Sequence, residues 1–311
     1  MPRSAGLAHI VRNTDGTSTG VWGIHTLQSA FQPIFGFRDG KLRIVAFEAL
    51  IRPFRDGQPV SPGSFFQGVP AVDRFHVETL SRTLHLLNAG ACLDPDTALF
   101  LNFDPSLFSD RAVVEVALRD TRLVMHEASL HPSRIVCELT EQTSGGRATL
   151  HFFVEMLRSH GLRIAVDDYG VDDSDMARID ALQPDFVKFD ARWISRLMLS
   201  GPGFALLEAM VATFARRGIA TVFEGIEETW QIEIAERCGA PMVQGFGLAR
   251  PELAPTGFSA FSRPADAAGA VSGRQAIAPN RRPAPLSAPP TAPAPRPHQP
   301  VRAFGRRGSS R

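Results

Sequence analysis

The chain of 311 residues can form one large domain or two small ones, and its 44% hydrophobic and 21% charged residues are typical of a globular protein. Its net charge of +1 hides an asymmetry. The segment from Pro264 onward holds eight arginines and one acid, which leaves a net charge of −6 on the residues before it. This mildly acidic part excludes a basic face for duplex nucleic acid.

The cysteines are too far apart in the sequence for a disulfide framework or a CxxC metal site, so we expect buried, reduced thiols at Cys92, Cys137 and Cys238. The first residues, Met-Pro-Arg-Ser, lack the apolar core of a signal peptide, and no apolar run is long enough to cross a bilayer. We therefore expect a cytoplasmic protein without a transmembrane segment.

Residues 1–23 are rich in Gly, Ser and Thr without a hydrophobic pattern, which indicates a flexible lead-in. An Asp39-Gly40 turn between the apolar runs 31–35 and 44–51 predicts an antiparallel hairpin. Beyond it, strand-like runs alternate with helical patterns. Apolar residues share one helix face in three places, namely Val77, Leu80, Leu84 and Leu87; Leu150, Phe153, Val154 and Leu157; and Leu207, Met210, Val211 and Phe214. Helix C-caps are expected at Gly90, Gly161 and Gly218.

The strand-like runs number eight in about 240 residues, close to the roughly 250 residues of a (β/α)₈ barrel. The opening hairpin breaks the all-parallel rule. We therefore predict an α/β fold, a TIM-like barrel with an antiparallel first strand, over residues 24–262. The alternative is a doubly wound open sheet, which would have a Gly-rich phosphate turn after an early strand; the sequence has no such turn.

Residues 263–311 are rich in Pro, Ala and Arg and cannot bury a core, so we predict a disordered C-terminal tail with polyproline II segments. An inert tail is the favoured interpretation. The alternative is a basic docking arm for an unknown partner, a membrane or nucleic acid.

Polar residues stand near the C-terminal ends of seven of the apolar runs. A strand covered on both faces should read as continuous Val, Ile, Leu and Phe, and a charge there is costly without a partner. Singly, each polar residue could be a cap or a surface residue; repeated on successive strand ends, they indicate a site at the barrel's C-terminal face. They are Glu48 in 44–51, Asn102 in 98–103, Glu138 in 135–139, Asp167 and Asp168 in 164–168, Lys188 in 186–189, Glu224 in 219–224, and Gln244 in 242–246.

Five carboxylates in one cavity repel one another, by about 4 kcal/mol for each pair at ~4 Å and an effective dielectric of 20, which exceeds what Lys188 can offset. Either several are protonated or divalent cations neutralise them. All-oxygen ligands favour Mg²⁺ or Mn²⁺, and the adjacent Asp167 and Asp168 suit two ions. By side-chain alternation Arg52 faces the same space as Glu48, nearer the mouth. Two hard ions beside an Arg and a Lys indicate phosphoryl transfer.

The same residues resemble the motifs of the EAL-domain cyclic di-GMP phosphodiesterases, in order, over about residues 27–252. EAL alone is a weak signal, whereas eight ordered elements are a strong one. The elements are Phe31-Gln-Pro-Ile, Glu48-Ala-Leu-Ile-Arg52, Leu101-Asn-Phe-Asp-Pro-Ser106, Glu138-Leu-Thr-Glu141, Asp167-Asp-Tyr-Gly170, Asp185-Phe-Val-Lys-Phe-Asp190, Glu224-Gly-Ile-Glu227 and Gln244-Gly-Phe246.

The resemblance implies hydrolysis of one phosphodiester of cyclic di-GMP to linear pGpG, in second-messenger signalling, by a homodimer. It implies that two Mg²⁺ or Mn²⁺ ions are bound by Glu48, Asn102, Glu138, Asp167, Asp168 and Glu224. It further implies catalytic roles for Lys188, Glu48, Glu224 and Gln244, and substrate contacts for Arg52, Leu50 and Asp190. Glu141 would anchor the dimer-forming loop after Asp168. Supporting or surface roles remain open for Glu141, Glu227 and Arg52.

The loop after Asp168 departs from the family pattern. Val171 replaces a threonine and Asp172 replaces a glycine, while Pro53 stands where an aromatic residue commonly follows the arginine. No GGDEF segment accompanies the predicted barrel. These departures motivate an alternative function, a weakly active or inactive EAL-type receptor that binds cyclic di-GMP or a protein partner. A protein that acts through its tail is a third possibility.

Overall fold

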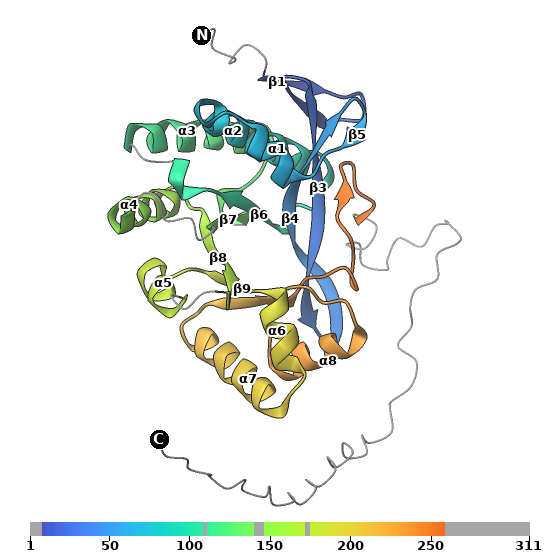
Figure 1. Cartoon of the computed structure of the whole chain (residues 1–311), viewed down its shortest axis with the longest axis vertical. Helices are drawn as coiled ribbons and strands as arrows, with labels where there is room; N and C mark the ends of the chain where they lie inside the picture. The colour runs from blue at the N-terminus through green and yellow to red at the C-terminus, as the bar shows by residue number, and fades with distance from the viewer. Residues whose placement is uncertain (1–7, 108–110, 140–145, 172–174, 259–311) are drawn as a thin grey trace, which may run out of the picture. The chain divides into compact units, whose positions relative to one another are not determined.

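The computed structural model describes residues 8–107, 111–139, 146–171 and 175–258. Eight strands close into a barrel, because the first strand pairs with both the second and the last (Figure 1). They are β3 (His25–Arg38), β4 (Lys41–Arg55), β6 (Ala98–Phe103), β7 (Ile135–Leu139), β8 (Arg163–Tyr169), β9 (Phe186–Phe189), β10 (Ala220–Phe223) and β11 (Met242–Val243).

The direction of β3 confirms the predicted antiparallel first strand. β3 runs antiparallel to both β4 and β11, whereas all the other neighbours in the barrel are parallel. The TIM-like barrel is therefore confirmed, and the open-sheet alternative is wrong. The long β3–β4 hairpin closes the barrel, because one edge of β3 pairs with β4 and its other edge pairs with β11, the last barrel strand.

Helices surround the barrel (Figure 1). They are α1 (Pro62–Gly68), α2 (Ala71–Cys92), α3 (Arg111–Glu127), α4 (Gly146–Ser159), α5 (Asp175–Leu182), α6 (Ala191–Met198), α7 (Gly201–Arg216) and α8 (Thr229–Arg237), with short 3₁₀ turns at Pro105–Leu107 and Pro132–Arg134. Most of the predicted apolar helix residues, such as Leu84, Leu157 and Leu207, are fully buried. The buried residues of α4 and α7 belong to the main core, whereas Val77, Leu80 and Leu84 of α2 form a separate cluster with Leu27 and Ile51. In both places the helical periodicity marked the buried face.

A second, smaller core fills the barrel itself. It contains one residue from each barrel strand: Ile34, Ala46, Phe100, Val136, Ala165, Phe186, Val222 and Met242. Such a layer of side chains makes a TIM barrel a packed core rather than a pore. Because side chains alternate along a strand, the residues two positions nearer the C-terminal face of the barrel also point inward. This layer is therefore the floor on which the candidate site is built.

The predicted flexible lead-in over residues 1–23 must be corrected for residues 8–22. This stretch forms β1 (Ala8–Arg12) and β2 (Ser18–Trp22), and β2 continues onto β3. The buried Asn88 of α2 accepts from the Ser18 backbone N–H at 2.6 Å and donates to its carbonyl at 3.0 Å. These contacts come from residues far along the chain, so the local composition gave no sign of them.

The predicted helix cap at Gly90 must also be corrected, because Gly90 lies inside α2. A Cβ at this position would lie 2.2 Å from the Ala128 carbonyl oxygen, so the glycine is required by a close approach of two backbones. By contrast, Gly161 and Gly218 follow α4 and α7 with φ of 79° and 75°, as expected for C-caps.

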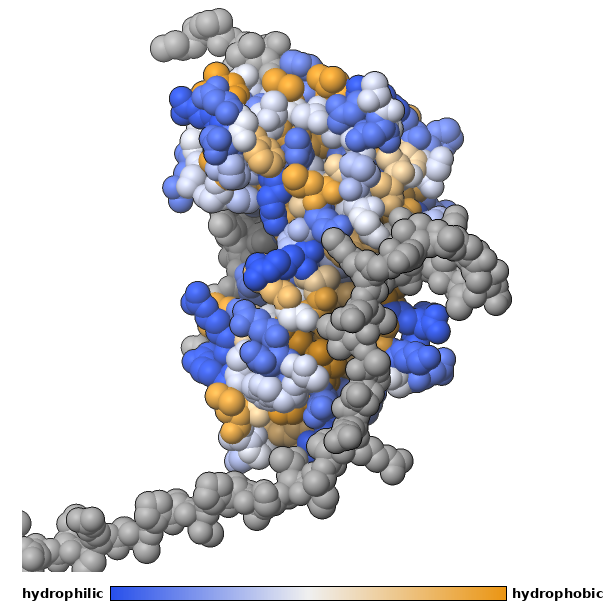
Figure 2. All heavy atoms as spheres, turned by 90° about the vertical axis from the view of Figure 1, so that its right-hand side faces the viewer, coloured by the Kyte–Doolittle hydropathy of each residue, from blue (hydrophilic) through white to orange (hydrophobic). Residues whose placement is uncertain are grey.

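Two short strands lie beside the barrel, β5 (Gln58–Pro59) on β4 and β12 (Glu252–Leu253) on β3. The face on this side mixes hydrophilic and hydrophobic residues (Figure 2). Within the described part of the chain, no helix has the length and apolar character needed to cross a membrane. The predicted tail, residues 263–311, lies outside the described residues.

Candidate active site

A ring of polar side chains lies directly above the apolar layer of the barrel. Each polar residue is two positions from a member of that layer, so all of them point inward. The ring consists of Gln32, Glu48, Asn102, Glu138, Asp167, Lys188, Glu224 and Gln244. The structure thus places seven predicted site residues in one inward-facing layer, together with Gln32, which the sequence analysis quoted only as part of the Phe31-Gln-Pro-Ile element.

Lys188 occupies the centre of this ring and is only 1% exposed. Its ammonium lies 2.7 Å from Glu138 Oε1 and 2.8 Å from Glu224 Oε1. Glu48 Oε2 and Asp167 Oδ1 are each 3.4 Å away from the same nitrogen. One cation therefore contacts four carboxylates, three from the strands β4, β7 and β8 and one from the residue that follows β10. This arrangement leaves the group with an excess of negative charge.

The excess charge perturbs the protonation of the site. Burial raises the pKa of Glu138 well above its usual range, and neighbouring Glu48 and Asp167 reinforce the shift against the opposing effect of Lys188. Burial likewise raises the pKa of Glu224 to about 8. The pKa of Lys188 is raised well above its ordinary value, because its four carboxylates outweigh the effect of its burial. Without metal ions, Lys188 therefore stays protonated, and Glu138 and Glu224 are partly protonated.

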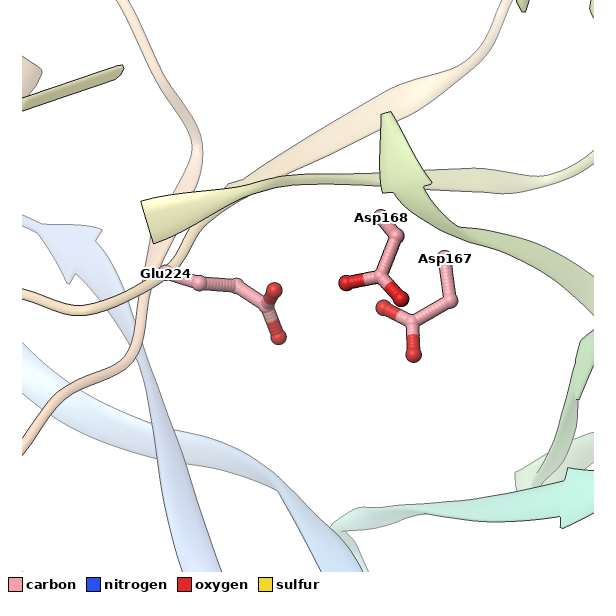
Figure 3. Close-up of side chains that lie close together, drawn as sticks. All are labelled: Asp167, Asp168 and Glu224. Carbon is pink, nitrogen blue, oxygen red and sulfur yellow. The ribbon is translucent and has the colours of Figure 1, made fainter. Parts of the chain in front are cut away.

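Asp167 and Asp168 are adjacent in sequence, yet both carboxylates face the site (Figure 3). The pairing of β8 with β9 is irregular between Val166 and Tyr169, and Asp168 adopts a left-handed φ of 57°. This bulge re-aims the second side chain, which plain strand alternation would turn away. Oxygen atoms of Asp167, Asp168 and Glu224 all lie within 4.8 Å of one another. Burial and the Asp167 charge raise the pKa of Asp168.

The oxygen atoms of the site suit the binding of divalent cations. Among the described residues, Oε2 of Glu138 and Oε1 of Gln244 are buried and accept no hydrogen bond, while Glu138 Oε1 and Asp167 Oδ1 share the single ammonium of Lys188 with two other carboxylates. Buried oxygens without donors are costly, and a bound cation would satisfy them. The ligands are all oxygen atoms, which suit Mg²⁺, Mn²⁺ or Ca²⁺ better than zinc. The ligand roles of the individual residues stay predictions.

A cavity of about 220 Å³ is lined by Glu48, Glu224 and Gln244, and also by Gln32, a residue the sequence analysis did not assign to the site. Gln32 pairs with Glu48 in the β3–β4 register and is 7% exposed. Gln244 Nε2 donates to Glu48 Oε2 at 2.7 Å, which joins the first and last strands of the barrel. A signal for Gln32 existed, because a glutamine interrupts the apolar run 31–35.

Two of the predicted substrate contacts, Arg52 and Leu50, line a second cavity, of about 200 Å³, together with Asn102. Asn102 stands opposite Glu138 in the β6–β7 register. Asp190 caps α6, since its carboxylate accepts from the Trp193 backbone N–H at 2.8 Å. The predicted contact of Asp190 with substrate stays a prediction.

Some predicted features lie outside the described residues. Glu141, the expected loop anchor, is one of them, and Asp172 and Asp173 of the altered loop are others. On either side of residues 172–174, Val171 and Met176 are 57% and 43% exposed. The predicted anchoring and dimer contacts of this loop stay predictions.

Comparison with known proteins identifies the family. The EAL domain model matches residues 24–251, the stretch that holds the whole barrel, and this chain belongs to the EAL domain family. Its sequence is similar to cyclic di-GMP phosphodiesterase RocR of Pseudomonas aeruginosa, with 27% identity over 230 residues, covering 72% of this chain and 57% of RocR. It is also similar to YkuI of Bacillus subtilis, an uncharacterized EAL-domain protein, with 29% identity over 226 residues, covering 71% of this chain and 54% of YkuI.

Solved structures agree with this family. The calcium and cyclic di-GMP complex of BlrP1 from Klebsiella pneumoniae matches with a TM-score of 0.65 and 28% identity, over 73% of this chain and 56% of BlrP1. The YkuI complex with substrate cyclic di-GMP and calcium matches with a TM-score of 0.63 and 26% identity, over 73% of this chain and 56% of YkuI. The chain thus matches little more than half the length of each of these relatives.

Proposed function

We propose that this protein is a cyclic di-GMP phosphodiesterase that uses two Mg²⁺ or Mn²⁺ ions. The observation that carries the proposal is the group formed by one ammonium, that of Lys188, and four carboxylates, whose negative charge exceeds what the lysine neutralises. Such a group needs cations to neutralise it and is poised for an anionic substrate. RocR is named as a cyclic di-GMP phosphodiesterase, and YkuI and BlrP1 hold cyclic di-GMP in their structures.

The expected reaction adds water across one phosphodiester, so that the P–O bond to the ribose 3′ oxygen breaks and linear pGpG forms. Bound metal ions would supply a nucleophile at neutral pH and stabilise the charge that develops on the phosphate. Glu48, Asn102, Glu138, Asp167, Asp168 and Glu224 would hold them. Lys188 stays protonated among its carboxylates, so its Nζ donates hydrogen bonds that orient the attacking water or neutralise a phosphate oxygen.

Arg52 would bind a phosphate group of the substrate at the mouth of the barrel. Its guanidinium is half-buried and donates to the Ile51 carbonyl at 3.0 Å, which fixes the side chain beside the cavity. A planar guanidinium offers two parallel donors to phosphate oxygens. A binding-only receptor is less well supported, because binding does not require the lysine and its complete set of carboxylates.

The direct test is hydrolysis of cyclic di-GMP by the full chain with Mg²⁺, Mn²⁺ or Ca²⁺, followed by chromatography of pGpG. Lys188→Ala and Glu48→Ala should abolish turnover without loss of the folded state by circular dichroism. Lys41→Ala, at an exposed lysine of the same barrel, is the matched control and should keep full activity. Cyclic di-GMP binding without any pGpG from the wild-type chain would refute the proposed activity and favour a receptor.

We further propose a homodimer that uses the loop after Asp168. The exposed apolar side chains of Val171 and Met176, which flank that loop, support the proposal. Light scattering of a Met176→Arg variant should give a monomer. A wild-type chain that is monomeric at micromolar concentration would refute it.

A further inference from the structure

The cavity beside Arg52 has a wall that the barrel does not supply. This wall is one face of α2, which contributes Glu78, Ser81, Arg82 and His85 at helical spacing. The opposite wall carries Leu50, Arg52 and Asn102, the residues placed at the edge of the catalytic ring. The cavity of about 200 Å³ is therefore continuous with the expected position of a phosphate, yet its α2 wall has no role in the chemistry described above.

The carboxylate of Glu78 is the acceptor in this wall. The side chain is 18% exposed, and its nearest cation, Arg82 Nη1, lies 3.9 Å from Oε2, which is too far for a hydrogen bond. Burial raises the pKa of Glu78, and the neighbouring arginine opposes that shift. Among the described residues, Glu78 accepts no side-chain hydrogen bond, so its oxygens are available to a donor in the cavity.

Arg82 holds this wall rigid. Its guanidinium lies 4.7 Å from the centroid of the Phe103 ring, and Nη2 donates to Thr79 Oγ1 at 3.2 Å. His85 is held nearby through a 2.9 Å contact between Nδ1 and Ser29 Oγ. A carboxylate carried by a helix face that is held in place, and mostly shielded from solvent, is pre-organised for recognition of a ligand.

We propose that Glu78 recognises a guanine base of the substrate, accepting hydrogen bonds from N1–H and the 2-amino group while Arg52 holds the adjoining phosphate. This inference rests on the proposed function, because that function names the nucleotide. Two parallel donors on the guanine edge match the two oxygens of a carboxylate. Adenine presents an acceptor at N1 and no 2-amino group, so the same carboxylate repels it. Glu78 is thus a specificity-determining residue.

The sharpest test compares cyclic di-GMP with cyclic di-IMP, which differs by loss of the 2-amino groups. Binding is measured by calorimetry on the full chain with Ca²⁺, the ion present with cyclic di-GMP in the BlrP1 and YkuI structures. The wild-type chain should prefer cyclic di-GMP by roughly tenfold. Glu78→Gln should weaken cyclic di-GMP binding by about 10- to 100-fold and remove most of that preference, since a good bidentate base contact is worth this much. Glu233→Gln, at an exposed glutamate of α8, is the matched control.

The outcomes separate the two proposals. Equal weakening of both ligands by Glu78→Gln would show a merely structural role and overturn the inference, as would unchanged cyclic di-GMP affinity. Hydrolysis of bis(p-nitrophenyl) phosphate, which has no base, should be the same in the variant and the wild type with Mn²⁺. Wild-type protein that binds cyclic di-GMP without hydrolysing it would refute the activity but leave the Glu78 test intact. Wild-type protein that hydrolyses the small diester without binding cyclic di-GMP would overturn the guanine site alone.

Discussion

Glu224→Gln should stabilise the metal-free protein near pH 8, although it removes a predicted metal ligand. Burial raises the pKa of Glu224 to about 8, whereas an unfolded glutamate titrates near 4.5. At a pH between about 4.5 and about 8, Glu224 is ionised in the unfolded chain but still protonated in the folded chain. Wild-type stability therefore falls as the pH rises from about 4.5 to about 8, and a glutamine, which carries no such proton, avoids this loss.

The magnitude follows from the size of the shift. Each pKa unit corresponds to about 1.4 kcal/mol, so the full shift would be worth about 5 kcal/mol. The Glu224 side chain is 19% exposed, and solvent screening lowers this figure. We expect Glu224→Gln to be more stable than the wild type by on the order of 3 kcal/mol at pH 8, and equally stable near pH 4.5.

Urea denaturation with a chelator, at pH 5, 6.5 and 8, measures this difference. Added Mn²⁺ should reverse the order at pH 8, because a ligand that binds only the folded state stabilises it by an amount that grows with the logarithm of its affinity, and the variant binds the ion more weakly. A variant that is less stable than the wild type at pH 8 without metal would refute the reasoning. Equal stabilisation of both proteins by Mn²⁺ would refute the ligand role of Glu224.

The neighbouring polar network and one glycine give three further predictions. Burial, aided by the charges of Arg52 and Arg82, lowers the pKa of His85 to about 3, so stability should fall by about 1.4 kcal/mol per unit as the pH drops below 6.5. A His85→Gln variant should lose that part of the slope in urea titrations at pH 7 and 5; an unchanged slope would contradict the assignment. Asn88→Ala should cost about 3 kcal/mol in urea denaturation, because it leaves buried backbone groups of Ser18 without partners. Gly90→Ala should lower Tm despite a helix-propensity gain of about 1 kcal/mol, and a higher Tm would show that α2 and α3 can separate at no cost.

The sequence was sufficient for the barrel and for most of its polar ring. Buried parallel strands are apolar on both faces, so Glu138 and Lys188 stood out as exceptions whose position along each strand could be read directly. Strand alternation then fixed the shared face, and Ala46 with Glu48 illustrates this, since one lies in the apolar layer and the other in the ring above it. Neither inference required knowledge of distant contacts.

Other features depended on contacts between distant segments. Gln32 lies on the antiparallel strand, where the C-terminal-end rule that identified the other residues does not apply. Asp168 reaches the site only through a bulge in β8, whereas simple alternation would turn it outward. The polar face of α2 was hidden because Glu78 reads as a surface acid until β4 and β6 are placed against it.

The sequence by itself therefore determined the fold class, the antiparallel first strand and most of the inward-facing polar ring, because these follow from periodicity within single elements. Only the tertiary structure decided that residues 8–22 form strands and that a base-sized cavity adjoins Arg52. Both depend on side chains that approach from far along the chain, and local hydrophobic patterns carry no information about such partners.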